Sequence, residues 1–403
     1  MSRTLPSTRV DLTAPRVPLG ATEGHGASAP RVGMVANTGF YLRQFRLGVL
    51  RGLRDAGHEV IVVTRADAHS AKLIAEGYHV EHVDVDSHGS SPRRDVQLAL
   101  QLRRVYREHR LDVVFHHTIK PNVFGTMAAR SVGIPSVAVL SGLGSFADLP
   151  RGPRRTFVNA LYRWAASAAA EVWFLNAHDR GYFEGRGWLD STPTSTLKTE
   201  GIDLDHFAYR EMPRRRPGTP LQALFAGRLL YKKGVAELVA AARLLRERGV
   251  AIEVSLLGPL DPHNPDSVAA GDLRSWTEAG DIRYLGEVVD VRGPLQRTDI
   301  VVQPTRYREG KSRILTEAMA TGRAIVTTDR PGAGELVEQG VNGYLVAEND
   351  ARGIARALEA FAGLSDLERE RMGVAGRRIA ERDHDQRTVI RAYRAAVGRL
   401  TRT

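Results

Sequence analysis

Short apolar runs alternate with longer amphipathic segments, and this alternation restricts the fold more than any other feature of the sequence. The runs at 32–36 and 59–65 flank a segment in which Phe45, Val49 and Leu53 recur at helical spacing. A strand, a helix and a second strand in this order form a unit with parallel strands. The pattern predicts further strands at 111–117, 135–142, 171–176, 222–230, 252–258, 282–286, 299–305 and 323–329. We therefore expect an α/β protein.

The length and one break in the alternation predict two domains. A chain of 403 residues usually holds more than one core, and the stretch 210–222, dense in Pro and Arg, is a candidate linker. Residues 1–30 are rich in Pro, Gly, Ser and Thr and lack a signal-peptide apolar core, so we expect a disordered leader. We predict an N-terminal domain at 31–210 and a C-terminal domain at 211–385. The helix expected in 386–403 could pack back on the N-terminal domain.

Composition excludes several classes of function. The chain has no cysteine, which rules out disulfides, thiolate catalysis and cysteine-based metal sites. No apolar run approaches the roughly 18–20 residues that a membrane-spanning helix needs. The net charge of +11 favours phosphate-bearing partners. A nucleic-acid partner fits the charge alone, but the sequence lacks a recognition motif and basic–aromatic interleaving, so we expect none.

Polar and small residues follow several of the predicted strands in the first half of the chain. Ligands of open α/β sheets lie outside the carboxyl ends of the strands, and two such domains facing each other form a cleft. His117 and Lys120 follow the strand at 111–117, where they form either a ligand contact or a polar strand end. Gly142 and Gly144 could admit a ligand close to the backbone, although ordinary turns use the same spacing.

The second half carries charged residues at equivalent places. Arg228 and Lys233 lie at a strand-to-helix junction, which suits a diphosphate, although solvated charges would look the same. Two glutamates, Glu309 and Glu317, flank the start of a helix for which Ser312 is a plausible N-cap. Free amides there could hold a phosphate, while the two carboxylates reach a sugar and a ribose. This spacing would match the length of a nucleotide-sugar.

These residues belong to segments that resemble a known family. The stretch EGKSRILTEAMATGRAIVTTDRPGAGELVEQGVNGYLV, from Glu309 to Val346, resembles the signature of the GT4-type retaining glycosyltransferases, with its pair of glutamates eight positions apart. GRLLYKKGVAELVAAARLL resembles the arginine-and-lysine phosphate motif of that family, and GIDLDHF its domain-junction motif. HTIKPNVFGTMAARSVGIPSVAVLSGLGSF resembles the branch that acts on undecaprenyl-diphosphate-linked sugars. The resemblance implies the GT-B fold, in which two Rossmann-like domains face each other across a cleft.

The resemblance also implies a reaction. A hexose or N-acetylhexosamine would move from a UDP-sugar to a lipid-linked saccharide, with retention at the anomeric carbon. Arg228 and Lys233 would hold the donor diphosphate, Glu309 would contact the donor sugar and His117 would lie near its reactive side. Glu317 would bind the ribose. No metal or other cofactor is implied, since the arginine and lysine would neutralise the diphosphate.

Further contacts follow from the same resemblance. Those expected on the donor are Gly310, Lys311, Ser312, Arg313, Ile314 and Leu315. Those expected on the acceptor side are Asn37, Thr38, Gly39, Lys120, Gly142 and Gly144. The pair Lys311-Ser312 departs from the branch, which usually has an apolar residue and a proline there.

A basic amphipathic segment bears on the location of the protein. Residues 151–170 contain four arginines and no acidic residue, with Phe157, Leu161 and Trp164 interleaved. The segment would lie on anionic lipid or pack into the first domain. We expect a cytoplasmic protein, peripheral on the inner face of the plasma membrane. A glycosyltransferase with a soluble acceptor and a non-catalytic nucleotide-sugar sensor are the alternatives.

Overall fold

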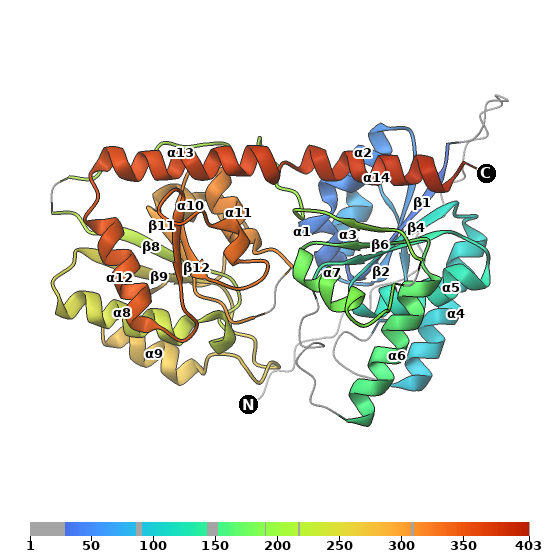
Figure 1. Ribbon diagram of the computed structural model, residues 1–403, viewed down its shortest axis with the longest axis horizontal. Helices are drawn as coiled ribbons and strands as arrows, with labels where there is room; N and C mark the ends of the chain where they lie inside the picture. Colours follow the sequence, from blue (N-terminus) through green and yellow to red (C-terminus); the bar gives the residue numbers. More distant parts are fainter. Residues whose placement is uncertain are drawn as a thin grey trace, which may run out of the picture.

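The computed structural model describes residues 29–85, 91–142, 152–189, 191–216, 218–307 and 310–402. Two predicted site residues, Gly144 and Glu309, lie outside these ranges, as do residues 1–28 of the expected leader. The described residues form two lobes, each built on one parallel sheet, and Figure 1 shows the lobes side by side. We call them the N-lobe and the C-lobe.

The N-lobe sheet has seven described strands in the order β3-β2-β1-β4-β5-β6-β7, all parallel. The strands are β1 (Arg31–Thr38), β2 (Glu59–Arg65), β3 (His79–His82), β4 (Val113–His117), β5 (Ser136–Leu140), β6 (Glu171–Phe174) and β7 (Thr194–Thr196). The helices between them are α1 (Gly39–Phe45), α2 (Leu47–Asp55), α3 (Ala68–Ala75), α4 (Pro92–Glu108), η1 (Pro121–Gly125), α5 (Thr126–Ser131), α6 (Pro153–Ala168) and α7 (Ala177–Glu184).

The C-lobe sheet has six described strands in the order β10-β9-β8-β11-β12-β13, again parallel. The strands are β8 (Leu221–Ala226), β9 (Ile252–Leu257), β10 (Arg283–Tyr284), β11 (Ile300–Gln303), β12 (Ala324–Thr328) and β13 (Gly343–Val346). The helices are η3 (Tyr231–Lys233), α8 (Val235–Glu247), α9 (Ala270–Glu278), α10 (Arg292–Arg297), α11 (Arg313–Ala320), η4 (Gly334–Leu336), α12 (Ala351–Ala362) and α13 (Asp366–Asp383).

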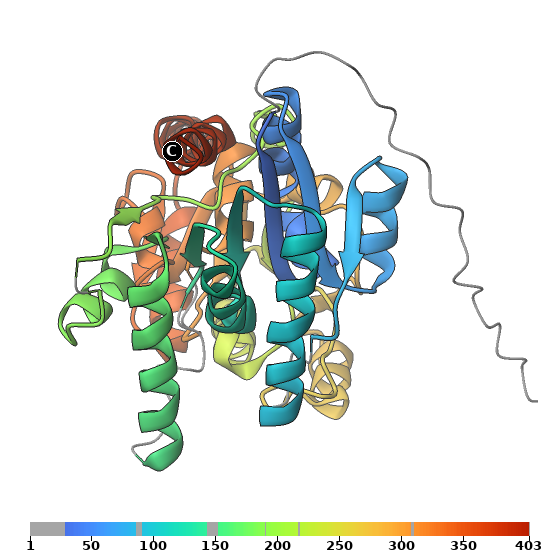
Figure 2. The same cartoon turned by 90° about the vertical axis from the view of Figure 1, so that its right-hand side faces the viewer.

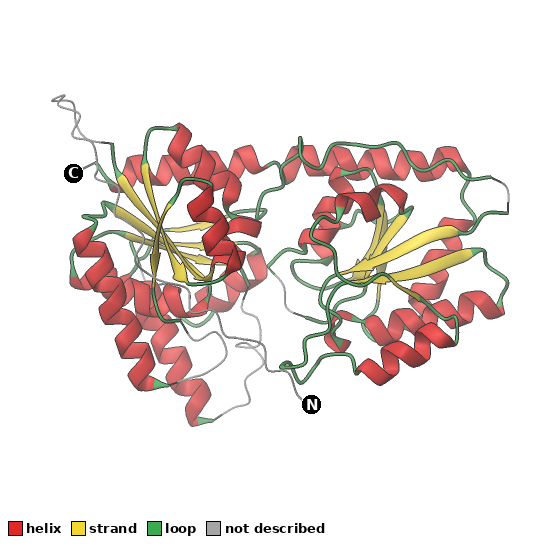
Figure 3. Ribbon diagram, turned by 180° about the vertical axis from the view of Figure 1, so that it is seen from behind, coloured by secondary structure: helices red, strands yellow, loops and turns green. Residues whose placement is uncertain are grey.

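Helices cover both faces of each sheet, as Figure 3 shows, and this explains why the strands are continuous apolar runs. Successive side chains of a strand point to opposite faces. Val113 and Phe115 of β4 belong to one hydrophobic cluster of the N-lobe, while Val114 between them belongs to another. The order of elements shows the expected alternation of strands and helices in both lobes.

The helix expected after β1 is broken in two at Arg46. Arg46 has backbone angles of φ −125° and ψ 2°, and it separates α1 from α2. Its side chain is 1% exposed and forms an ion pair with Glu200. It also donates to the Tyr41 hydroxyl over 3.0 Å. Helical spacing already places residue 46 on the same face as the buried Val49 and Leu53, so the break lies at a charged side chain that points inward.

The chain crosses between the lobes twice, and the two crossings lie together. The first is the segment that leads from β7 to β8, and the second joins α13 to the final helix α14 (Gln386–Leu400). The Ile202 amide donates to the His384 carbonyl over 2.8 Å, and the Gln386 amide donates back to Ile202 over 2.9 Å. Helix α14 then packs on α2 of the N-lobe, and Tyr393 has no exposed surface (Figure 1).

Candidate functional site

The loops that follow the strands of the two sheets meet at the junction between the lobes. A Cβ atom on Gly310, which follows β11, would lie 2.1 Å from the Ser141 carbonyl oxygen, which follows β5. Only glycine permits so close an approach of two backbones. The Arg313 guanidinium of α11 lies 5.3 Å from the centre of the Phe45 ring of α1. The structure therefore brings together loops that the sequence analysis assigned to the donor and the acceptor.

Arg228 and Lys233 follow β8 at the carboxyl edge of the C-lobe sheet. Arg228 is half-exposed, and its Nη1 lies 3.0 Å from the Asp261 carboxylate. The Lys233 ammonium lies 3.6 Å from the position that a Cβ atom on Gly227 would occupy, so it points back over the end of β8. Lys233 directly precedes Gly234, the N-cap of α8, whose free amides add positive partial charge.

Glu317 lies on the second turn of α11 and is 4% exposed. Its Oε1 accepts from the Arg313 Nε over 2.7 Å. Burial raises the pKa of Glu317, and the Arg313 cation opposes that rise. The carboxylate therefore lies beneath Arg313, the same side chain that reaches across the junction to Phe45.

The two residues that depart from the family pattern have partners in the C-lobe. The Lys311 ammonium, 5% exposed, pairs with the Glu335 carboxylate of η4. The Ser312 hydroxyl donates to the Gln303 side chain at the end of β11. Ser312 precedes α11, as expected, but its side chain makes no capping hydrogen bond. The pair with Glu335 neutralises the charge of Lys311 within the segment from Glu309 to Val346. Ile314 and Leu315 pack into the core.

His117 ends β4 and is enclosed by aromatic rings. Its Nδ1 donates to the Val35 carbonyl over 3.2 Å, so the neutral ring accepts at Nε2 from the Tyr393 hydroxyl over 2.8 Å. The Tyr41 ring lies 5.7 Å away on another side. Burial, together with the Arg46 cation, holds the pKa of His117 well below its ordinary value. His117 is therefore a neutral residue beneath the N-lobe edge, and its position near a donor sugar stays a prediction.

The remaining N-lobe residues form a connected edge. The backbone amide of Asn37 donates to the Thr118 hydroxyl over 3.1 Å. Thr118 has a left-handed backbone, with φ 67°, at the end of β4, and such strained residues cluster at functional sites. The Gly39 amide donates to Asp67, and Thr38 caps α1.

Two acceptor-side candidates differ in their surroundings. The Lys120 ammonium lies 2.8 Å from Asp95 of α4, and both side chains are largely shielded. Gly142 follows Ser141 with φ 127°, which favours glycine, and it directly follows the carbonyl that Gly310 approaches. Lys120 is thus held against α4, while Gly142 lies at the junction.

A cavity of about 660 Å³ opens at the carboxyl ends of β2 and β3, which the sequence analysis did not single out. Its lining consists of Arg65, Ala66, His82, Val83, Asp84, Val85, Arg94 and Gln97. His82 lies 3.2 Å from the Ser70 hydroxyl, and a Cβ atom on Gly39 would lie 2.5 Å from the Ser70 amide. The cavity therefore adjoins the Asn37–Gly39 loop. Its lining carries two arginines, which suit an anion, and one carboxylate, Asp84, which offsets part of their charge.

Two helices of the N-lobe present apolar side chains to solvent. Phe157 and Trp164 of α6 are 63% and 37% exposed, and Val96 and Leu100 of α4 are 59% and 58% exposed. Figure 2 shows α4 and α6 pointing the same way along one side of the lobe, and both contact α5 between them. Within the described ranges, no helix combines the length and apolar character that crossing a bilayer requires.

Two family models match separate parts of this chain. Residues 32–176 match the family described as Glycosyl transferase 4-like, and residues 220–363 match Glycosyl transferases group 1. A Campylobacter jejuni relative is 27% identical over 343 residues, which span 81% of this chain and 88% of that relative. It is N,N'-diacetylbacillosaminyl-diphospho-undecaprenol alpha-1,3-N-acetylgalactosaminyltransferase.

Solved structures give the fold. A glycosyltransferase from Rickettsia africae superimposes with a TM-score of 0.77 at 15% identity, covering 93% of this chain and 99% of that one. The Anabaena protein HepE in complex with UDP superimposes with a TM-score of 0.73 at 18% identity, covering 92% and 99%. The expected GT-B fold is confirmed.

Proposed function

This chain belongs to the GT4-type glycosyltransferases, and on that premise we propose a donor, an acceptor and a stereochemical course. The enzyme transfers a hexose or N-acetylhexosamine from a UDP-sugar to an undecaprenyl-diphosphate-linked saccharide, with retention of configuration. The observation that carries the proposal is the similarity, over most of both chains, to a transferase that acts on a sugar carried by diphospho-undecaprenol.

The donor lies along the C-lobe edge in this proposal. Arg228 and Lys233 hold the diphosphate, because both follow β8 and Lys233 directly precedes the start of α8. Glu317 accepts two hydrogen bonds from the ribose, which requires Arg313 to move from its present ion pair. Arg313 would then be released from Glu317 only when the donor is in place.

The transfer itself is a front-side displacement. An acceptor hydroxyl attacks the anomeric carbon on the face from which UDP departs, and the departing diphosphate oxygen takes its proton. The bond from the sugar to UDP breaks as the bond to the acceptor forms. Arg228 and Lys233 stabilise the charge on the departing diphosphate, as a divalent metal does in other transferases. Glu309 contacts the donor sugar next to the reacting centre.

The acceptor lies along the N-lobe edge. The cavity beside the Asn37–Gly39 loop supports an anionic acceptor, because Arg65 and Arg94 line it. Two arginines match the diphosphate of a lipid-linked saccharide. The glycan would then extend from this cavity toward the junction at Gly310.

The lipid tail requires contact with a membrane. The exposed Phe157 and Trp164 of α6, with Arg155 and Arg163 on the same helix, support a basic amphipathic surface. We place this surface on the anionic inner face of the plasma membrane, where the cytoplasm supplies UDP-sugars.

The experiment that tests the reaction is mass spectrometry of products. The purified protein is incubated with a panel of UDP-sugars and undecaprenyl-diphosphate-GlcNAc or a short-chain analogue. We expect the acceptor mass to rise by one hexose or one N-acetylhexosamine with one of these donors. Absence of product with every donor, in a preparation that binds UDP, would overturn the proposed acceptor and favour a soluble acceptor or a sensor.

A second experiment tests the membrane surface. Phe157→Asp should reduce flotation with anionic vesicles by about tenfold or more, since it places a charge at the lipid contact. Leu367→Asp is the matched control, because Leu367 is 58% exposed but lies on α13 of the C-lobe. Equal loss in both variants, or no flotation of the unmodified protein at low salt, would contradict the proposal.

A further inference from the structure

A cluster of two histidines and one glutamate lies at the amino edge of the N-lobe sheet. His79 and Glu81 belong to the edge strand β3, and because they are two residues apart they share one face of the strand. His109 ends α4 and reaches the same point. His79 begins β3 and His109 ends α4, so the cluster faces the amino side of the sheet, although Glu81 directly precedes His82 in the lining of the cavity.

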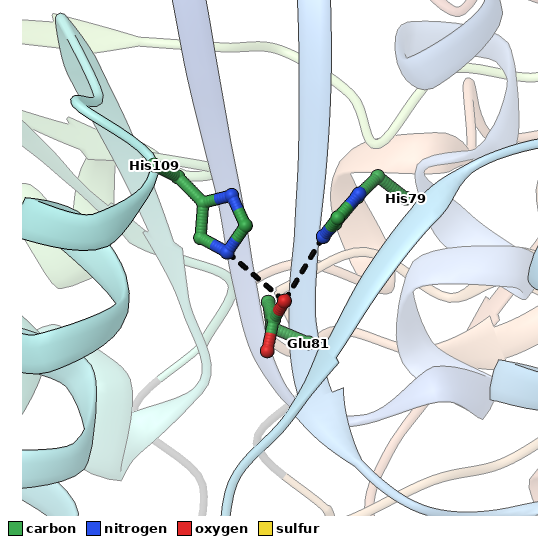
Figure 4. Close-up of side chains that lie close together, drawn as sticks. All are labelled: His79, Glu81 and His109. Carbon is green, nitrogen blue, oxygen red and sulfur yellow. Dashed lines mark hydrogen bonds and ion pairs between the residues drawn. The ribbon is translucent and has the colours of Figure 1, made fainter. Parts of the chain in front are cut away.

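The three side chains point their donor atoms at one place, as Figure 4 shows. The Nε2 atoms of His79 and His109 each lie 2.9 Å from the same oxygen, Oε1 of Glu81. All three donor atoms lie within 4.8 Å of one another. The two imidazole rings meet edge to face with their centres 4.7 Å apart. A single carboxylate oxygen thus faces two imidazole nitrogens.

The backbone holds this arrangement in place. β3 pairs with β2 from His79 onward. The His109 amide donates to Val105 at the end of α4, and the His109 carbonyl accepts from Arg31 at the start of β1 over 3.3 Å. The Arg31 cation is itself paired with Glu59, over 2.8 Å, which offsets its charge near the cluster.

We propose that His79, Glu81 and His109 form a binding site for a transition-metal ion of the zinc class. Two imidazoles and one carboxylate are ligands that zinc, cobalt and nickel accept. Ligand atoms around tetrahedral zinc, at about 2.1 Å from the metal, lie about 3.4 Å apart. The cluster reaches this spacing by small rotations of side chains, because its donors already lie within 4.8 Å.

The metal would stabilise the N-lobe rather than take part in the glycosyl transfer. His79 is half-exposed, so a fourth position is open to water. The ion would connect the short edge strand β3 to the end of α4. This role leaves unchanged the expectation that the transfer needs no metal, since His79, Glu81 and His109 are not among the residues that line the cavity or the donor edge.

Cobalt(II) is the probe, because its visible absorption reports the ligands around it. The full chain, without a polyhistidine tag, is stripped with EDTA and titrated with CoCl₂. We expect a tetrahedral or five-coordinate absorption band that saturates at one ion per chain, and displacement of cobalt by zinc. Zinc at about 100 times its dissociation constant should raise the Tm by about 5 °C.

Three variants assign the ligands. His79→Ala, His109→Ala and Glu81→Gln should each weaken cobalt binding tenfold or more. Glu81→Gln keeps the shape of the side chain, so it remains informative if a histidine variant fails to fold, as circular dichroism would show. His178→Ala removes an exposed histidine of α7 and serves as the control. Binding that is unchanged in Glu81→Gln, or lost equally in His178→Ala, would overturn the site.

Discussion

The candidate residues of the two lobes differ in what surrounds their side chains. On the C-lobe edge, Arg228 is 46% exposed and pairs with a neighbouring loop residue, Asp261. On the N-lobe edge, His117 has no exposed surface, and its ring is hydrogen-bonded to the Tyr393 hydroxyl of α14. Arg228 therefore offers its charge directly to a ligand, whereas His117 is part of a buried polar network.

This difference separates two kinds of effect. Substitutions on the donor edge should change turnover with little change in stability, because an exposed cation adds little to folding. Substitutions in the N-lobe network should change stability first, because they leave buried polar atoms without partners. The experiments below test that separation, beginning with the largest effect.

Removal of the Lys233 ammonium should have the largest effect, and it should fall on catalysis. Lys233→Ala is expected to lower kcat/KM by roughly 100- to 1,000-fold, about 3–4 kcal/mol, because charge on the departing diphosphate loses a stabilising cation. The unfolding free energy should stay within about 0.5 kcal/mol of the unmodified protein. Steady-state kinetics and urea unfolding measure the two quantities.

The neighbouring lysine supplies the control. Lys232 is exposed, and it contacts Asp266 through its backbone amide, which Lys232→Ala retains. If both variants lose activity equally, the donor edge acts only through its general positive charge.

Acid should weaken the N-lobe before the C-lobe. Burial lowers the pKa of His116 to about 3 and holds that of His117 well below its ordinary value, while unfolded histidine titrates near 6.5. The unfolded chain therefore binds more protons than the folded one below pH 6.5. The stability contributed by the neutral rings is complete above that pH and is lost as the pH falls, by roughly 2 kcal/mol per histidine at pH 5.

Two tryptophans report the lobes separately. Trp173 is buried in the N-lobe, and Trp276 packs on the C-lobe core. Urea unfolding at pH 7 and pH 5, in variants that keep one of these tryptophans, should show the larger loss at Trp173. An equal loss of unfolding free energy at Trp173 and Trp276 would contradict the distinction between the lobes.

Loss of one hydroxyl should have a smaller effect on the N-lobe. Tyr393→Phe removes the donor to His117 Nε2 and leaves that buried atom unpaired, so the N-lobe should lose about 1–3 kcal/mol of unfolding free energy. Tyr78→Phe is the matched control, because the buried Tyr78 hydroxyl has no hydrogen-bond partner within the described part of the chain. Its removal should change stability by less than about 0.5 kcal/mol, as the Trp173 transition would show.

The smallest effect is expected for Lys120. Lys120→Met keeps the apolar stem but breaks the shielded pair with Asp95, which should cost about 1 kcal/mol of unfolding free energy. Arg104→Met breaks the exposed pair with Glu108 in the same lobe and should cost less than about 0.5 kcal/mol. A rise in the acceptor KM for Lys120→Met, without a loss of stability, would instead place Lys120 on the acceptor.

The sequence could predict the C-lobe site well because its signals are local. Arg228 and Lys233 lie within one strand-to-helix junction, and the glutamate motif is a continuous stretch. The apolar runs predicted most strands of both sheets, but three strands at the sheet edges, β3, β7 and β13, were missed. HVEH of β3 carries only one apolar residue and TST of β7 carries none, so neither forms an apolar run. The partner of Lys311 was also missed, since pairing with Glu335 depends on the turn at η4.

The N-lobe surroundings could not be predicted because they depend on distant segments. The contact of His117 with Tyr393 joins residues 276 positions apart. Arg46 turns inward toward Glu200, in the first crossing between the lobes. Helical spacing places Arg46 on the same face as Val49 and Leu53, and only the folded chain supplies the carboxylate that lets a charge be buried there. Glu309 and Gly144 lie outside the described residues, so their roles stay predictions.

The position of α14 has a consequence for synthesis on the ribosome. Val389, Tyr393 and Val397 of this helix complete a hydrophobic cluster whose other members come from the first half of the chain. A nascent chain must therefore carry an uncovered apolar groove beside α2 while the whole C-lobe is being translated. The N-lobe is synthesised first but completes its core last. Until α14 packs on it, its exposed apolar surface favours aggregation and chaperone binding.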